Sequence, residues 1–191
     1  RPETNIHCWT GIKEMEIKAT PKYRFINKSW IEKRIDNGKM PTSEKLSKEE
    51  LTDSLDLSRD EFKAIIQKCN ELDMDGDGST TNEVPLAFVS GNWQGNESDF
   101  IASFGVPENK EHKTIVNDKV GFTIEDENWF RAISEMNEWF REGLIRSTSF
   151  TQSQDSFLAN GQDGRYGAFY WWEKETVVAN PDDYIIVQPL K

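Results

Sequence analysis

Residues 58–89 read SRDEFKAIIQKCNELDMDGDGSTTNEVPLAFV. This segment predicts a helix, an acidic loop and a strand in succession. Ser58 and Glu61 form the pattern of a capping box at a helix start. Apolar residues then recur at helical spacing, at Phe62, Ile65, Ile66, Cys69 and Leu72. Residues 84–89 are apolar and bounded by turn residues, which predicts a buried strand.

The loop between helix and strand has the composition of a calcium site. Calcium takes about six to eight oxygen ligands, and alternating carboxylates on a glycine-containing loop can converge on one cation. The candidate ligands are Asp73, Asp75, Asp77, Ser79, Asn82 and Glu83. A solvated acidic turn is the alternative, because Asp and Gly also dominate ordinary turns. The loop differs from an EF-hand loop, which carries a Glu at its twelfth position. Here the twelfth position is Val84, the glutamate is one residue earlier at Glu83, and a predicted strand replaces the exit helix. We therefore expect a structural site rather than a sensor.

The rest of the chain alternates helices with short apolar strands. A helix is predicted over 126–142, with Gly143 and Leu144 as its stop, and Trp129, Phe130 and Trp139 are expected to lie in the core. Residues 1–22 show no sustained periodicity and are expected to be irregular or extended. Further helices are predicted over 29–35 and 151–160, and further strands over 167–172 and 184–187. This order is typical of a layered α/β domain.

The composition of the chain excludes several classes of protein. The chain has 191 residues, 12% aromatics and a formal charge of −11, so it should fold as one domain and not bind nucleic acid, which requires concentrated positive charge. Its apolar runs are too short to cross a bilayer, and the residues after Arg1 and Pro2 include no apolar stretch of the kind expected in a signal peptide. Cys8 and Cys69 form neither a disulfide framework nor a zinc motif.

Several motifs in order resemble the extracellular solute-binding proteins of ABC importers, family 1, the large oligosaccharide-binding lipoprotein type. The acidic loop begins Asp73-Met74-Asp75-Gly76-Asp77-Gly78 and continues into Asn82-Glu83-Val84-Pro85-Leu86. The family has a similar run, in which proline stands in the place of Met74. The other matching segments are Ser29-Trp30-Ile31, Met40-Pro41-Thr42, Ser103-Phe104-Gly105-Val106-Pro107, Trp139-Phe140-Arg141-Glu142-Gly143-Leu144-Ile145 and Val187-Gln188-Pro189-Leu190-Lys191.

The resemblance implies one lobe of a two-lobe, periplasmic-binding-protein-like (type II) α/β fold. Residues 23–191 would form the lobe, with 1–22 as a lead-in, 43–56 as an insertion and 73–83 as the calcium loop. The implied function is capture of an extracellular solute, a carbohydrate or oligosaccharide, without catalysis. The implied partners are the permease subunits of the transporter, and the membrane is reached only through a lipid anchor outside this chain.

Aromatic residues mark where a sugar could bind. Rings stack on the apolar C–H faces of sugars, and ligands of open α/β sheets gather beyond the carboxyl ends of strands. The candidates are Trp171 or Trp172, with Tyr170 and Glu173 as polar neighbours, and Trp93 in a polar loop. Burial of these rings in the core is the alternative, and a persistent strand would bury at most one of the two adjacent tryptophans.

Two other functional classes remain possible at this point. The acidic loop is compatible with a calcium-binding interaction module or buffer. A glycoside hydrolase fragment would need two positioned carboxyl groups, and no pair stands out among the many acids.

Overall fold

A five-stranded sheet forms the centre of the computed structural model, which describes residues 6–7, 16–17, 23–36, 54–109 and 111–190. The strand order is β4-β9-β3-β8-β5. β3 runs antiparallel to both of its neighbours, whereas β4 is parallel to β9 and β5 is parallel to β8. The bounds are Tyr23–Asn27 for β3, Ser54–Leu55 for β4, Val84–Ala87 for β5, Tyr166–Trp171 for β8 and Tyr184–Val187 for β9.

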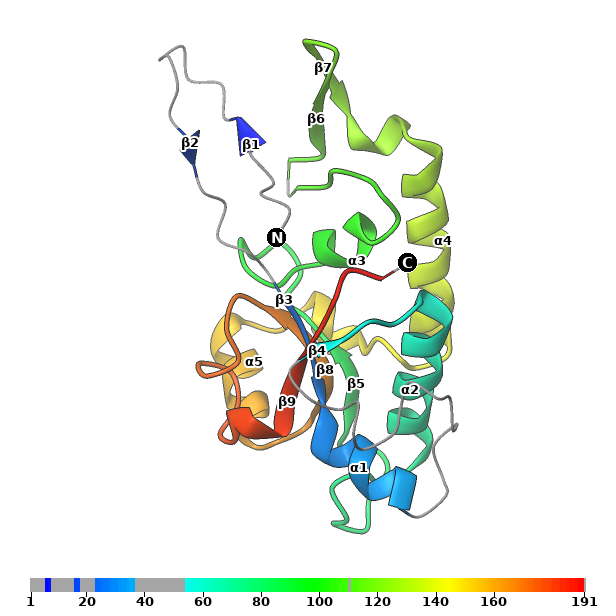
Figure 1. The fold of residues 1–191 in the computed structure, drawn as a ribbon, viewed down its shortest axis with the longest axis vertical. Helices are drawn as coiled ribbons and strands as arrows, with labels where there is room; N and C mark the ends of the chain where they lie inside the picture. Colours follow the sequence, from blue (N-terminus) through cyan, green and yellow to red (C-terminus); the bar gives the residue numbers. More distant parts are fainter. Residues whose placement is uncertain (1–5, 8–15, 18–22, 37–53, 110, 191) are drawn as a thin grey trace.

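Helices cover both faces of this sheet, as Figure 1 shows with α5 on one side and α2 and α4 on the other. The architecture is therefore a mixed α/β sheet flanked by helices, as the sequence predicts. The helices are α1 Lys28–Asp36, α2 Arg59–Glu71, α3 Ser98–Ala102, α4 Glu127–Arg141 and α5 Gln154–Gln162. Short 3-10 turns occupy Thr123–Glu125, Ser147–Phe150 and Pro181–Asp183.

β8 is buried along its whole length because both of its faces are covered. Its side chains alternate between two cores: Ala168 and Tyr170 join the core under α2 and α4, and Phe169 and Trp171 join the core under α5. In the second core the Trp171 ring stacks on Phe157 of α5, with a centroid distance of 5.0 Å. β8 therefore ties the two layers together.

The ends of the two longest helices match the sequence prediction. Ser58 and Glu61 form a complete capping box at the start of α2. After α4, Gly143 adopts a φ of 79°, the Leu144 N–H donates to the Trp139 carbonyl at 2.8 Å and the Gly143 N–H donates to Phe140 at 3.1 Å. This is the Schellman geometry that glycine permits.

One prediction about the core is wrong. Trp139 is fully buried and Trp129 is half-buried, but Phe130 is 60% exposed. The α4 residues Ala132, Met136 and Trp139 face the core, and Phe130 lies off that stripe, so its ring points to solvent.

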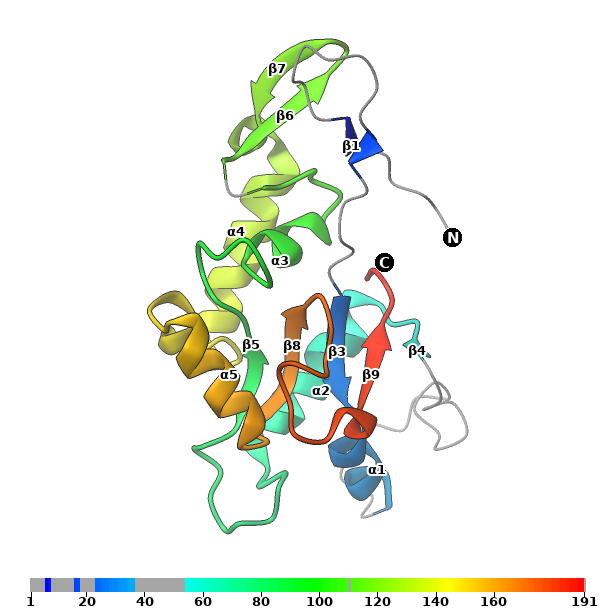
Figure 2. The same ribbon diagram turned by 90° about the vertical axis from the view of Figure 1, so that its left-hand side faces the viewer.

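Two small sheets lie outside the central one. β6 (Lys113–Val116) and β7 (Lys119–Phe122) form a hairpin that rises beyond the end of α4 (Figure 2). Its turn uses Asn117 and Asp118, both with positive φ. β1 (Ile6–His7) and β2 (Glu16–Ile17) pair antiparallel.

Some sequence expectations fall partly outside the described residues. Only 54–56 of the expected insertion are described, and Ser54 and Leu55 form β4 at an edge of the sheet. The Met40-Pro41-Thr42 motif is not among the described residues. No helix in the part of the chain that the structure describes has both the length and the apolar character needed to cross a bilayer.

Candidate functional site

The acidic loop joins α2 to β5 and lies at the end of the sheet where β5 begins (Figure 2). Ligand atoms of Asp73, Asp75 and Glu83 lie within 4.8 Å of one another. Three carboxylates at this separation repel one another unless a cation lies between them. The donor set is all oxygen, which suits a hard divalent cation such as calcium.

Backbone amides fix the carboxylates of the loop. Asp73 accepts from the Gly76 N–H at 2.6 Å and from the Gly78 N–H at 3.0 Å, and Asp75 accepts from the Asp77 N–H at 3.0 Å. Gly76 and Gly78 have φ values of 86° and 93°, a region that favours glycine. The sequence thus wraps the chain around the carboxylates.

Glu83 is the residue of this loop whose surroundings most specifically indicate a cation site. The residue is 1% exposed, and its Oε1 accepts from the Met74 N–H at 2.9 Å. Its Oε2 is buried and accepts no hydrogen bond from the described residues. A buried carboxylate oxygen without a partner is costly, so a cation at this position would remove the penalty.

The other candidate ligands lie outside that group of three. Asp77 accepts from Asn82 Nδ2 at 2.7 Å and from the Ser79 N–H at 2.8 Å. The Ser79 hydroxyl pairs with that of Thr81 at 3.1 Å. Asn82 Oδ1 is buried and, like Glu83 Oε2, has no partner among the described residues. The structure therefore joins Asp73, Asp75 and Glu83, and holds Asp77, Ser79 and Asn82 in the adjoining turn.

The charge of Glu83 also affects the α2 thiol. Burial raises the pKa of Cys69 from its ordinary value of 9.0 to about 12, and the negative charge of Glu83 adds to the rise. Cys69 is therefore a neutral thiol that fills the core.

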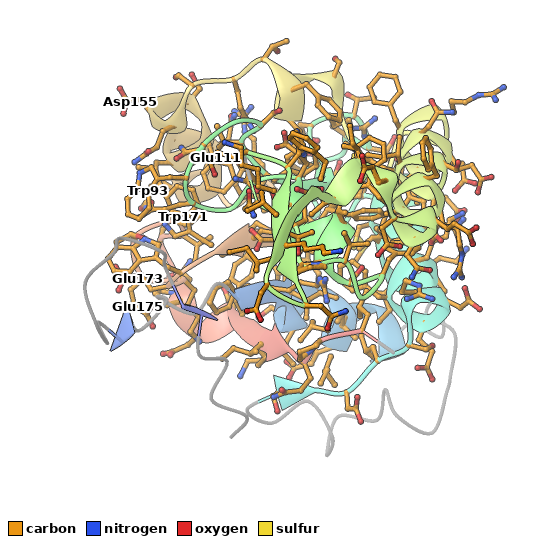
Figure 3. The ribbon with its side chains drawn as sticks, turned by 90° about the horizontal axis from the view of Figure 1, so that it is seen from above. Trp93, Glu111, Asp155, Trp171, Glu173 and Glu175 are labelled. Atoms are coloured by element: carbon orange, nitrogen blue, oxygen red, sulfur yellow. The ribbon has the colours of Figure 1, made fainter. Side chains whose placement is uncertain are left out.

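The aromatic candidates lie at the opposite end of β5, where the parallel strands β5 and β8 terminate. Figure 3 shows Trp93 and Trp171 on one side of the molecule, near Glu173 and Glu175. Trp93 is 64% exposed and Trp172 is 37% exposed, whereas Tyr170 and Trp171 are buried. As the alternation of a strand requires, one of the adjacent tryptophans is buried and its neighbour is not.

Tyr170 and Trp171 consequently offer no face to a ligand in solution, contrary to the sequence expectation. Trp171 belongs to the core under α5 and donates to the Thr176 hydroxyl at 3.2 Å. Tyr170 belongs to the other core, where its hydroxyl accepts from Arg24 Nε at 3.4 Å. Glu173, expected as a polar neighbour, is half-buried.

The loop of Trp93 lies directly on the end of β8. Gly95 has a φ of 53°, and a Cβ on it would come within 2.0 Å of the Tyr170 carbonyl oxygen and 2.7 Å of the Trp171 ring. The sequence singles out Trp93 but not Gly95, because a close backbone contact leaves no signal beyond the glycine itself.

Comparisons with known proteins agree with this arrangement. No protein-family model matches the sequence. The chain is 26% identical over 195 aligned residues to the fructooligosaccharide ABC transporter substrate-binding protein FusA of Streptococcus pneumoniae, covering 99% of this chain and 33% of FusA.

Solved structures of ABC transporter substrate-binding proteins are also similar to this chain. The structure of S. pneumoniae FusA in complex with kestose matches with a TM-score of 0.69 and 25% identity, over 86% of this chain and 30% of FusA. An HMO-binding, ABC-transporter-associated solute-binding protein of Bifidobacterium longum infantis has the same fold, with a TM-score of 0.66 at 17% identity, over 89% of this chain and 34% of that protein.

The chain thus spans about a third of the length of the relatives it matches. Sequence and fold together identify it as a relative of the substrate-binding proteins of ABC transporters, corresponding to one lobe of such a protein.

Proposed function

We propose that the chain is part of the substrate-binding component of an ABC importer and captures an oligosaccharide outside the cell. The observation that carries this proposal is the similarity to FusA along 99% of the chain. In this function the lobe does not catalyse a reaction. It delivers the solute to permease subunits, and a lipid anchor outside this chain holds the protein at the cell membrane.

The ligand would contact the edge formed by the carboxyl ends of β5 and β8. Among the described residues, Trp93 and Trp172 are the exposed tryptophans at this edge, and a flat ring suits the C–H face of a sugar. Trp171 lies beneath the Trp93 loop and supports it, as the close approach of Gly95 indicates. Tyr170 has the same supporting role from the opposite core.

A panel titration tests carbohydrate binding. The protein is titrated with kestose, other fructo-oligosaccharides and unrelated glycans by isothermal calorimetry. Stacking on one ring contributes on the order of 1 kcal/mol, so Trp93→Ala and Trp172→Ala should each weaken binding by about five- to tenfold. Phe130→Ala is the matched control, because this ring is also exposed but lies on α4. Binding of no glycan, or equal losses in all three variants, would contradict the proposal.

We also propose that the acidic loop holds one structural calcium ion. Asp73, Asp75 and Glu83 would be its principal ligands, with Asp77, Ser79 and Asn82 as further contributors. The uncompensated Oε2 of Glu83 supports this proposal. A FusA structure described as an EF-hand mutant is also similar to this chain. The acidic loop joins α2 to β5 at the opposite end of β5 from the Trp93 edge. Calcium in this loop would therefore stabilise the junction of α2 and β5.

Calcium binding has its own test. A cation present at about one hundred times its dissociation constant adds about 2.7 kcal/mol to the free energy of unfolding, which for a chain of this size raises Tm by about 5–10 °C. We expect a stoichiometry of one and this rise in Tm for the parent protein, but not for Glu83→Gln. Glu125→Gln, which alters an exposed acid on a separate turn, should keep both. Identical melting of calcium-loaded and chelator-treated protein would refute the site, and cooperative binding of two ions would favour a calcium-binding module.

A further inference from the structure

The loop that follows β5 is held by hydrogen bonds along most of its length. The Val89 N–H donates to the Gly95 carbonyl at 2.9 Å and closes the loop on itself. The Ser90 N–H donates to the Ser149 carbonyl at 3.0 Å and fixes the loop to the neighbouring 3-10 turn. The loop is therefore tied both to itself and to the neighbouring turn.

Both neighbours of Trp93 are fixed. Asn92 donates from its Nδ2 to Gln154 Oε1 at 3.1 Å, its Oδ1 accepts from the Gln94 N–H at 3.2 Å, and its carbonyl accepts from Asn96 Nδ2. Gln94 is buried. Trp93 thus projects from a constrained backbone while 64% of the residue remains exposed. A large ring on a fixed base loses little conformational entropy on binding.

Glu97 reaches back across this loop. Its Oε1 accepts from the Ser90 hydroxyl at 2.9 Å and its Oε2 accepts from the Gly91 N–H at 3.2 Å. Glu97 also precedes α3, but its side chain makes no capping hydrogen bond to that helix. Both contacts of the carboxylate therefore serve the turn before Trp93 and not the helix.

We propose that Glu97 is a positioning residue, whose carboxylate clamps the turn at Ser90 and Gly91 so that Trp93 is presented in one orientation to a carbohydrate. The nature of the ligand rests on the proposed function, whereas the ordering of Trp93 does not. Without the clamp, the ring and its loop would have to be immobilised when the sugar binds. That cost reduces affinity by about five- to tenfold.

The experiment follows the Trp93 ring directly. The protein is labelled with 5-fluorotryptophan, and Trp93→Phe identifies the Trp93 signal among the seven tryptophan resonances in the ¹⁹F NMR spectrum. In Glu97→Ala we expect this resonance to move towards its position in the unfolded protein, while the resonances of tryptophans remote from this loop, such as Trp30, Trp129 and Trp139, stay in place. Glu97→Gln should resemble the parent, since its amide can accept from the Gly91 N–H and donate to the Ser90 hydroxyl.

Two further measurements complete the design. Ser90→Ala removes one of the two donors and should give a smaller displacement of the same resonance. Titration with kestose should show a five- to tenfold loss of affinity in Glu97→Ala and none in Glu97→Gln or in the control Glu125→Ala. An unmoved Trp93 resonance in Glu97→Ala and Ser90→Ala, or movement of all seven resonances, would overturn the inference. A displaced resonance in a protein that binds no sugar would refute the proposed function and leave the positioning role intact.

Discussion

Substitution of Gly95 by alanine should destabilise the protein more than substitution of Gly91, although both glycines lie in the same loop with positive φ. Gly91 has a φ of 70° with open space where a Cβ would lie. Gly95 has a φ of 53°, and its added Cβ would come within 2.0 Å of the Tyr170 carbonyl oxygen. The pair therefore separates backbone strain from steric conflict.

The expected magnitudes follow from these two costs. A left-handed conformation costs a non-glycine residue about 1–2 kcal/mol, and this cost applies to both variants. Forcing an extra carbon into a filled space costs about 1–3 kcal/mol more, and this cost applies only to Gly95→Ala. We expect losses of about 1.5 kcal/mol for Gly91→Ala and about 3.5 kcal/mol for Gly95→Ala, which correspond to decreases in Tm of about 4 °C and about 10 °C.

Urea denaturation followed by far-UV circular dichroism measures both losses under the same conditions. The slope of unfolding free energy against urea should stay constant, so that the shift in midpoint reports stability alone. Equal midpoints for the two variants would refute the reasoning, because the close contact with Tyr170 would then contribute nothing. Trp93→Ala provides a reference for a change in the same loop at an exposed side chain, where we expect little loss.

Three further changes test other parts of the fold. Ser58→Ala removes the capping box of α2 and should cost about 1 kcal/mol in urea denaturation, whereas Ser58→Thr should cost little. Gly143→Ala places a side chain at a φ of 79° and should cost about 1–2 kcal/mol by the same assay, while preserving the helical circular dichroism signal. In a Cys8→Ser background, Cys69 should not react with a thiol reagent at pH 8 until the protein is unfolded. Because its pKa is 9.0 in an ordinary setting and about 12 in the fold, the unfolded chain loses this proton first, so the stability contributed by the neutral thiol is intact below pH 9 and should fall between pH 9 and 12. A Cys69→Ala variant should lose less stability over that range.

Elements with local signals were predictable from the sequence. The capping box at Ser58 and the glycine stop at Gly143 each depend on residues within one helical turn, and the structure confirms both. β3 was not predicted, because Asn27 leads directly into α1 without a turn residue between them. The β6–β7 hairpin was also missed, since its turn is Asn117-Asp118 and lacks the glycine that marks most two-residue hairpins.

The site was predictable to the level of loops but not of individual side chains. The alternation of a strand allows at most one of Trp171 and Trp172 to be buried, yet the core under α5, where Phe157 stacks on Trp171, determines that Trp171 is the buried one. Asp77 and Glu83 have equal weight in the sequence, and the fold buries only Glu83 beneath the loop. In both cases the missing information is tertiary, because it depends on an element distant in the chain or on the depth of the loop.

The position of β3 also has a consequence for how the lobe folds. β3 is the first strand of the central sheet in the chain, yet its two partners, β8 and β9, are the last; the contact between Arg24 and Tyr170 joins residues 146 positions apart. Such non-local pairing makes folding slow, because a long loop must close before the strands stabilise each other. During synthesis Phe25 and Ile26 therefore have no sheet to join until almost the whole lobe has been made. A circular permutation that placed β3 directly after β9 would turn this last step of assembly into a local one.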